Sequence, residues 1–339
     1  MSNLNIDTKT VLPTETDEQI QERLNAQAHR KEVLSRIVPF TGLAFLLVFF
    51  TVVTKGGFLN RSNLVNLINQ CFSLVIICTG ATFIHGHGGS DFSVGAVCGC
   101  AQLVAAYFLT SLGLPLWVCL LSCVLVSVAA TCTTATIRLM FGVPAFVGSM
   151  CIRTAFSGIL TTVTQKKEFF ISNQTYGFMD SFALKAVVLV VFISAGYYLF
   201  EYTSLGKNLR AIGGNVNTAT QAGIKTKKNM YMAYILLGIC VGVAAIFQMF
   251  RTGGVNANSG NGLEFNTLMA IVLGGFPMHG GEKARLSSAI TGALTVTVLM
   301  NGLAFWGVDT NMINLIKGVL FVAIVGLAYD KSKGKLVEQ

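Results

Sequence analysis

Apolar residues run almost without interruption from Ile37 to Tyr329, and one long polar segment divides them. This segment, residues 201–229, reads EYTSLGKNLRAIGGNVNTATQAGIKTKKN and holds a single acid, Glu201, among four lysines and one arginine. A membrane-spanning helix needs about 20 predominantly apolar residues, and the chain offers such stretches repeatedly. The pattern therefore predicts a protein that lies within a bilayer, with residues 201–229 as a polar surface between two groups of spans.

The composition excludes an ordinary soluble protein. Charged residues make up 12% of the chain and hydrophobic residues 53%, whereas soluble domains carry about 25% charged residues. The net charge of +9 is spread between the apolar stretches and forms no single basic patch, which disfavours nucleic acid as a partner. The nine cysteines lie within apolar stretches and no histidine completes a zinc set, so we expect them to pack and to bind no metal.

Ten apolar stretches are candidate membrane spans. Six are clear and four are interrupted or polar at one end; the clear ones are 37–53, 114–137, 143–164, 183–200, 230–250 and 311–329, and the others are 64–84, 94–112, 267–275 with its continuation, and 287–304. We therefore predict an all-α polytopic membrane protein of about ten transmembrane helices, with discontinuous or re-entrant helices and two pseudo-repeated halves.

Lysine and arginine indicate the orientation of these spans. With ten spans, one side holds only Lys55, Arg61, Lys166, Lys167, Lys185 and Arg251, and the other side holds most of the remaining basic residues. The positive-inside rule places the more basic side in the cytoplasm. We expect a cytoplasmic segment at 1–36, a membrane domain at 37–330 that includes the cytoplasmic segment 201–229, and a cytoplasmic tail at 331–339.

Two glycine-rich interruptions, 86–95 and 274–282, break the apolar pattern. Non-helical backbone at membrane depth persists only where it is buried in protein or lines a cavity, and paired broken helices are typical of transporters. Asp91 and Ser93 lie where the next helix should begin, so we expect helix capping, with a direct role in transport as the alternative. Apart from Asp91, we expect only Glu282 as a carboxylate near such a break.

Three stretches of the chain resemble one family. The residues GGSDFSVGAV (Gly88 to Val97) look like the GG-I-D-L-S-V-G motif of permease subunits in ribose/galactose-type ABC sugar importers. Residues Ser204 to Ile224 resemble the cytoplasmic coupling segment of that family, and Gly274 to Gly302 with Ile316-Lys317-Gly318 resemble its C-terminal part. The resemblance covers about residues 37–330 and extends to the branched-chain amino acid/sugar permease superfamily.

The resemblance implies a function and a set of partners. A permease of this kind lies in the plasma (inner) membrane, is not an enzyme, and translocates a monosaccharide, ribose-like or a hexose. It pairs with a second permease subunit, identical or similar, and works with a cytoplasmic ATP-binding subunit and an extracellular or periplasmic sugar-binding protein. The residues themselves agree on one point: the chain has no G-x-x-x-x-G-K-[ST] phosphate loop, so we expect the partner subunit to bind ATP and this chain to hold no cofactor.

The polar segment contains the candidate contacts with the ATPase. Its sequence predicts a short helix that begins near Ser204 and ends at a glycine pair. We expect apolar contacts from Leu205, Leu209 and Ile212 and polar contacts from Lys207 and Arg210; an ordinary solvated loop is the alternative. The full candidate coupling set is Ser204, Leu205, Gly206, Lys207, Leu209, Arg210, Gly213, Gly214 and Asn215.

Other polar residues are candidates for the translocation path. Four polar residues at helical spacing should share one helix face and point to the bundle interior: Asn66, Asn69, Gln70 and Ser73. This arrangement suits either hydrogen bonds between helices or a polar path for the solute. Together with the first break, the candidate path residues are Asn66, Asn69, Gln70, Ser73, Gly88, Gly89, Asp91 and Ser93.

Charged and ionisable residues within the apolar stretches leave an alternative function open. Arg153 and Lys317 lie within predicted spans and are functional candidates by default, with Asp180, Glu168 or Asp309 as the acids considered for pairing. Three histidines beside glycines suit packing or capping, or the proton coupling of an ion-driven secondary transporter of a small polar solute; they are His85, His87 and His279. An intramembrane enzyme is disfavoured, because no HExxH or GxSxG sequence and no convergent His/Asp/Glu set occurs.

Overall fold

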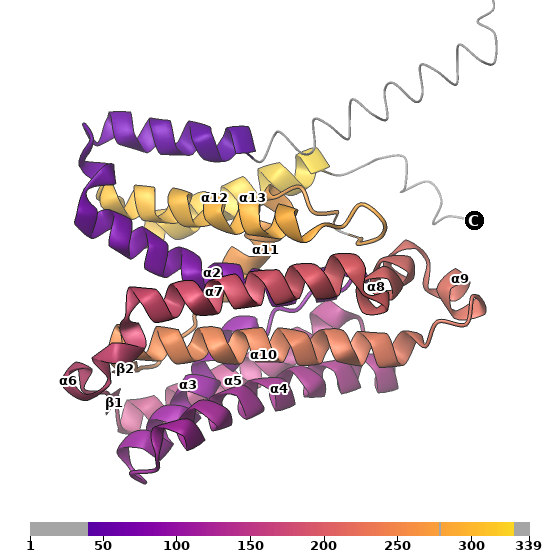
Figure 1. The fold of residues 1–339 in the computed structure, drawn as a ribbon, viewed down its shortest axis with the longest axis horizontal. Coiled ribbons are helices and arrows are strands. Elements are labelled where there is room, and N and C mark those ends of the chain that lie inside the picture. Colours follow the sequence, from indigo (N-terminus) through magenta and orange to yellow (C-terminus); the bar gives the residue numbers. More distant parts are fainter. Residues whose placement is uncertain (1–39, 278, 329–339) are drawn as a thin grey trace, which may run out of the picture.

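The computed structural model of the protein describes residues 40–277 and 279–328 and is almost entirely helical (Figure 1). The segments expected to be cytoplasmic at 1–36 and 331–339 lie outside these residues. In chain order the elements are the helix Phe40–Val53, η1 (Gly57–Leu59), α2 (Arg61–Gly86), α3 (Val94–Thr110), α4 (Leu116–Phe141), α5 (Ala145–Lys166), β1 (Phe169–Phe170), α6 (Asn173–Tyr176), η2 (Gly177–Asp180), α7 (Phe182–Tyr197), η3 (Tyr198–Tyr202), α8 (Ser204–Gly214), α9 (Val216–Gln221), α10 (Thr226–Thr252), β2 (Gly254–Val255), α11 (Leu263–Leu273), α12 (Leu286–Phe305) and α13 (Thr310–Ala328).

Six helices are long and apolar enough to cross a membrane: α2, α4, α5, α7 continued by η3, α10 and α12. Four shorter apolar helices, namely Phe40–Val53, α3, α11 and α13, account for the other predicted spans. The protein is therefore a helical, multi-pass membrane protein. α2 and α12, two of the spans expected to be interrupted or polar at one end, are long, continuous helices, and α2 is polar at its start.

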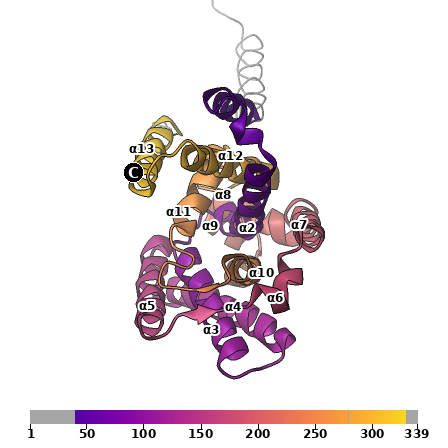
Figure 2. The same ribbon diagram turned by 90° about the vertical axis from the view of Figure 1, so that its left-hand side faces the viewer.

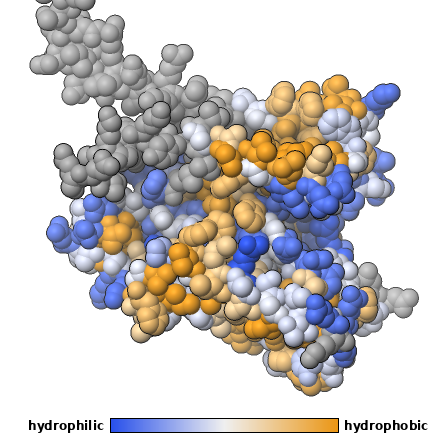
Figure 3. Space-filling model, turned by 180° about the vertical axis from the view of Figure 1, so that it is seen from behind, coloured by the Kyte–Doolittle hydropathy of each residue, from blue (hydrophilic) through white to orange (hydrophobic). Residues whose placement is uncertain are grey.

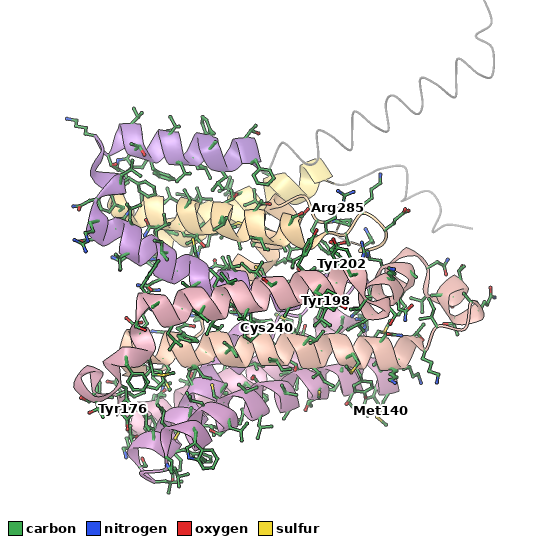
Figure 4. The ribbon with its side chains drawn as sticks, in the orientation of Figure 1. Met140, Tyr176, Tyr198, Tyr202, Cys240 and Arg285 are labelled. Atoms are coloured by element: carbon green, nitrogen blue, oxygen red, sulfur yellow. The ribbon has the colours of Figure 1, made fainter. Side chains whose placement is uncertain are left out.

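The main helices run between two ends of the molecule (Figure 1). One end carries α8 and α9, and we call it the α8 end. The opposite end carries α6 and the short antiparallel pair β1–β2, in which Phe169 lies opposite Val255, and we call it the β end. Tyr198, Tyr202 and Arg285 lie toward the α8 end, and Tyr176 lies at the β end (Figure 4).

α2 and α10 form the centre of the bundle. α10 packs against both α2 and α4, and the small residues Gly238 and Gly242 allow the backbones of α10 and α4 to approach closely. A Cβ atom on Gly238 would lie 2.6 Å from the Cα of Val128, and one on Gly242 would lie 2.7 Å from the Cα of Val124. Close packing of small residues is the usual way in which membrane helices associate.

The peripheral helices have a different character from the central ones. In the most apolar window of α2, 78% of the residues are buried inside the protein, but in α7 only 11% are. The exposed side chains of α7 include Val187, Val190 and Val191. Because the outward side of α7 carries such apolar side chains, this helix is suited to contact lipid.

Three breaks interrupt the helical bundle, and the sequence predicted two of them. The segments 87–93 and 274–285 separate α2 from α3 and α11 from α12. The third break, 256–262, comes from the β end and reaches deep into the bundle, because the carbonyl of Gly260 packs against Gly95 and that of Ser259 packs against Gly99. At a rise of 1.5 Å per residue, Gly95 lies about 22 Å along α3 from the residue that ends it, Thr110.

Candidate coupling surface and translocation site

The polar segment forms two short helices at the α8 end. A π-helical turn, η3, ends α7, and an extended Thr203 separates it from α8. α8 begins at Ser204 and ends at Gly214, where the sequence predicted it to begin and end. The Oδ1 atom of Asn215 then accepts hydrogen bonds from the backbone N–H groups of Asn217 (2.9 Å) and Thr218 (3.0 Å), which caps α9.

Two of the three expected apolar contacts of α8, Leu209 and Ile212, point inward, so the prediction was wrong for these two residues. Leu209 is 0% exposed and Ile212 is 1% exposed, and Leu205 is half-buried. Ile212 packs with Ala219 of α9 and Met230 of α10. Leu209 and Ile212 therefore hold α8 on the protein itself, whereas Leu205 is partly exposed and stays a predicted contact.

Glu201 and Arg210 fix α8 to the neighbouring elements. The Nη1 atom of Arg210 lies 3.0 Å from Oε2 of Glu201, and its Nη2 atom donates a hydrogen bond of 2.9 Å to the carbonyl of Phe200. The other carboxylate oxygen of Glu201 accepts a hydrogen bond of 3.3 Å from the backbone N–H of Leu286, the first residue of α12. One ion pair therefore joins the end of α7, α8 and the start of α12.

The two predicted breaks meet beneath α8. The N–H of Gly281 donates a hydrogen bond of 3.1 Å to the carbonyl of Gly86, the last residue of α2. A Cβ atom on Gly213 would collide with that same carbonyl and would lie 2.6 Å from the nitrogen of Gly281. Gly280 adopts a φ of +68° at the same contact. α8 therefore packs directly against the backbone at both breaks.

The outer side of α8 is open and charged. Its exposed residues border a shallow groove lined by Lys207, Arg210, Ala211, Gly214 and Glu282. Near this end, Tyr198 and Tyr202 stack with ring centroids 6.2 Å apart, and both are exposed. Exposed tyrosines are typical of the boundary between membrane and water.

Asp91 stabilises the first break but does not cap α3. Its Oδ1 atom accepts hydrogen bonds from the backbone N–H (2.7 Å) and the hydroxyl (2.6 Å) of Ser93. Ser93 is itself the residue before α3 and makes no side-chain cap. The expected cap is therefore a local turn instead. The other oxygen of Asp91, Oδ2, is buried with no hydrogen-bond partner among the described residues.

The predicted histidines divide between interior and surface. The Nδ1–H of His85 donates a hydrogen bond of 2.9 Å to the carbonyl of Ala81. Arg138 donates to Nδ1 of His87 at 3.3 Å, and both histidines are buried. His279 is exposed, and its backbone carbonyl lies against Gly88.

The four polar residues on the predicted face of α2 have different surroundings. Gln70 and Ser73 line a polar cavity of about 190 Å³ between α2, α10, α11 and α12. Asn69 instead accepts a hydrogen bond of 2.7 Å from Nζ of Lys185, which is also paired with Asp180 at 2.5 Å. Asn66 is exposed, so the expectation that all four face the interior was wrong for this residue.

Gly88 and Gly89 line a second cavity, of about 270 Å³, beside α11. Its other lining residues are His85, Ser90, Phe92, Leu268, Ile271, Val272 and Phe321. The first break thus borders enclosed space on the side of α11, as expected of irregular backbone at membrane depth.

The sequence did not reveal the ion-pair partner of Arg153. Its Nη2 atom lies 2.6 Å from Oε1 of Glu264, whose side chain is 1% exposed. Neither Glu168, Asp180 nor Asp309 takes this role. Glu264 directly follows the third break, so the expectation that only Glu282 joins Asp91 beside a break was also wrong. The signal in the sequence was the run Asn-Ser-Gly-Asn-Gly before Glu264, which looked like an ordinary surface loop.

These features define a class: a helical membrane protein of transporter type, with broken helices that meet a polar surface at one end. Residues 63–325 match the family described as "Branched-chain amino acid transport system / permease component". Because this match spans most of the chain, the protein belongs to that family of permease components.

Curated relatives agree with this assignment. The chain is 28% identical over 322 residues to the ribose import permease protein RbsC of Bacillus subtilis (strain 168), covering 93% of this chain and 99% of that protein. It is 26% identical over 296 residues to the D-allose transport system permease protein AlsC of Escherichia coli (strain K12), covering 84% and 89%. A probable ABC transporter permease protein, YphD of the same strain, is 26% identical over 303 residues, covering 87% and 91%. No solved structure matches the chain. The named relatives are permeases, which fits a role other than catalysis.

Proposed function

We propose that this chain is the membrane-spanning permease subunit of an ABC importer that carries a monosaccharide across the plasma (inner) membrane. Membership of the permease family and the ribose and allose permeases among the relatives support this function. The substrate is a ribose-like sugar or a hexose, and the energy comes from a separate ATP-binding subunit. A sugar-binding protein outside the membrane delivers the solute, and a second permease subunit completes the transport unit.

The orientation follows from charge. The α8 end carries Lys207, Arg210, Lys225, Lys227, Lys228 and Arg138, and the positive-inside rule places such an end in the cytoplasm. Ten elements then cross the membrane: the six long helices and the four shorter apolar ones. The β end faces outward and receives the sugar-binding protein.

α8 transmits the motion of the ATPase to the membrane domain. In this mechanism the ATP-binding subunit docks on the groove beside Lys207 and Glu282 and moves α8 as ATP binds. The observation that carries the proposal is the contact of Gly213 with the carbonyl of Gly86 and the nitrogen of Gly281. Through it, displacement of α8 shifts the ends of α2 and of the segment before α12 together, and alternating access follows from the movement of these broken helices.

Gly213 and Gly214 provide a matched test of this mechanism. A methyl group at Gly213 lies too close to the backbone of Gly86 and Gly281, so α8 or one of these segments must shift, whereas one at Gly214 meets nothing within 4 Å. Alanine favours a helix over glycine, so neither change should unfold α8. We expect Gly213→Ala to lower sugar uptake per ATP hydrolysed by about tenfold and Gly214→Ala to have little effect.

The measurement uses the complex purified in mild detergent from the source cells and reconstituted in vesicles. The measurement first requires that an ATPase is recovered together with the tagged chain. Sugar uptake and ATP hydrolysis are then measured on the same vesicles. Equal coupling ratios for the two variants would contradict the role of Gly213. Recovery of the chain without an ATPase, with uptake that collapses when the ion gradient is dissipated, would instead favour a secondary transporter.

A further inference from the structure

A charged cavity of about 360 Å³ lies between α5, α11 and α13. Figure 2 shows these three helices on one side of the molecule, with α11 between the other two. From behind, the surface is hollowed between two hydrophobic regions, and hydrophilic residues lie in the hollow (Figure 3). The cavity is lined by Arg153, Asn261, Gly262, Glu264, Phe265, Met269, Asn314, Lys317, Gly318 and Phe321.

The charges of this cavity lie deep within the predicted membrane region. Arg153 is about 12 Å along α5 from Ala145, and Lys317 is about 10 Å along α13 from Thr310, at 1.5 Å per residue. The carboxylate of Glu264 is held in place by Arg153 and by contact with Gly95 of α3. Charged side chains at such depth are costly unless they face protein or a water-filled path, and they mark solute pathways.

The lining has the chemistry that a polyhydroxylated solute requires. Two amide side chains, Asn261 and Asn314, offer both donors and acceptors to hydroxyl groups, and both are exposed. Phe265 supplies an aromatic face, and the guanidinium carbon of Arg153 lies 5.7 Å from its ring centroid. Small-molecule sites combine an apolar or aromatic wall with a few convergent polar groups in this way.

The cavity also adjoins the space beside the first break. Phe321 lines both this cavity and the one of about 270 Å³ that contains Gly88 and Gly89. Phe92 of that second cavity contacts Phe265 of the first, with ring centroids 6.0 Å apart. The two spaces therefore lie in series, and the second ends at Gly88, which packs against the carbonyl of His279 near α8.

We propose that the cavity between α5, α11 and α13 is the binding site of the sugar at mid-depth in the membrane, with Asn314 and Phe265 in contact with it. The proposal rests on the proposed function and names the place where this importer holds its solute in transit. The cavity around Gln70 is less suitable: at about 190 Å³ it is below the roughly 300–1,000 Å³ typical of small-molecule sites.

Two asparagines of α13 allow a matched test. Asn314 lines the cavity, and Asn311, three residues earlier, is equally exposed but does not. Tryptophan at position 314 fills part of the cavity, so we expect Asn314→Trp to lower ATP-driven uptake of labelled D-ribose or D-allose by about tenfold or more. ATP hydrolysis stimulated by the sugar-binding protein should persist, and Asn311→Trp should transport like the unmodified chain.

Two further substitutions at position 314 separate solute contact from folding. Asn314→Gln keeps the amide group and should retain most uptake, whereas Asn314→Leu keeps the size but removes the hydrogen bonds and should raise the sugar concentration needed for half-maximal uptake. Unchanged uptake per ATP in Asn314→Trp would overturn the site while leaving the importer function intact. If the unmodified complex moves neither sugar, the proposed function fails first and the site fails with it.

Discussion

At the scale of single residues, the pair formed by Arg153 and Glu264 is the least replaceable charge contact of the described chain. Glu264 is almost fully buried, whereas Arg153 keeps 29% of its side chain exposed to the cavity. Removing one partner of a buried ion pair typically costs 3–5 kcal/mol, because the other charge stays in a region of low dielectric. We expect Arg153→Met to destabilise the protein by about 3 kcal/mol, the lower end of that range, measured by thermal unfolding of the purified complex in detergent.

The double variant Arg153→Met/Glu264→Gln tests the cause of this loss. It removes the unpaired carboxylate as well as the cation, so it should be more stable than Arg153→Met alone. If the two variants unfold at the same temperature, the loss comes from the packing of the arginine side chain rather than from an uncompensated charge.

At the scale of elements, the limits of α8 were predictable but its orientation was not. Ser204 and the Gly213-Gly214 pair marked its ends because start and stop signals are local. Helical spacing likewise predicted that Leu209 and Ile212 share a face, yet spacing does not reveal what covers that face. The cover comes from α2, α9 and α10, and Leu209 and Ile212, which were taken for ATPase contacts, instead anchor the helix to the protein.

Arg210 and Lys207 should therefore contribute to coupling in different ways. Arg210 holds α8 to Glu201 and to the carbonyl of Phe200, whereas Lys207 is exposed beside the groove. We expect Arg210→Ala to lower sugar uptake per ATP severalfold and, because Arg210 also lines the groove, to lose some bound ATPase, but less than Lys207→Ala. Lys207→Ala should instead weaken retention of the ATPase, so that less of it is recovered with the tagged chain as the salt concentration rises.

Identical losses of bound ATPase in Arg210→Ala and Lys207→Ala would contradict these separate roles of the two residues. Glu201→Gln is the control for Arg210, because it weakens the same ion pair from the other side and leaves the outer groove unchanged. It should reproduce the loss of coupling and not the loss of binding.

At the scale of the whole molecule, the apolar stretches were sufficient to predict a multi-pass membrane protein, but not its third break. Residues 256–262 are rich in asparagine, glycine and serine, a composition shared by ordinary surface loops. Their depth depends on Gly95 and Gly99 of α3, whose missing side chains admit the carbonyls of Gly260 and Ser259. Such contacts between distant segments leave no periodic signal, and the Arg153–Glu264 pair was missed for the same reason.

The orientation of the bundle gives the last prediction. Thr175 at the β end and Asn217 in α9 are both exposed and lie at opposite ends of the molecule. The native cysteines provide little background, because they are buried or lie within the membrane helices, including the exposed Cys151 of α5. We expect a membrane-impermeant maleimide added to intact cells from which any outer membrane has been removed to label Thr175→Cys and not Asn217→Cys, and both after the membrane is opened. The reverse pattern would place α8 outside, where no ATP-binding subunit can reach it, and the importer mechanism would have to be abandoned together with the orientation.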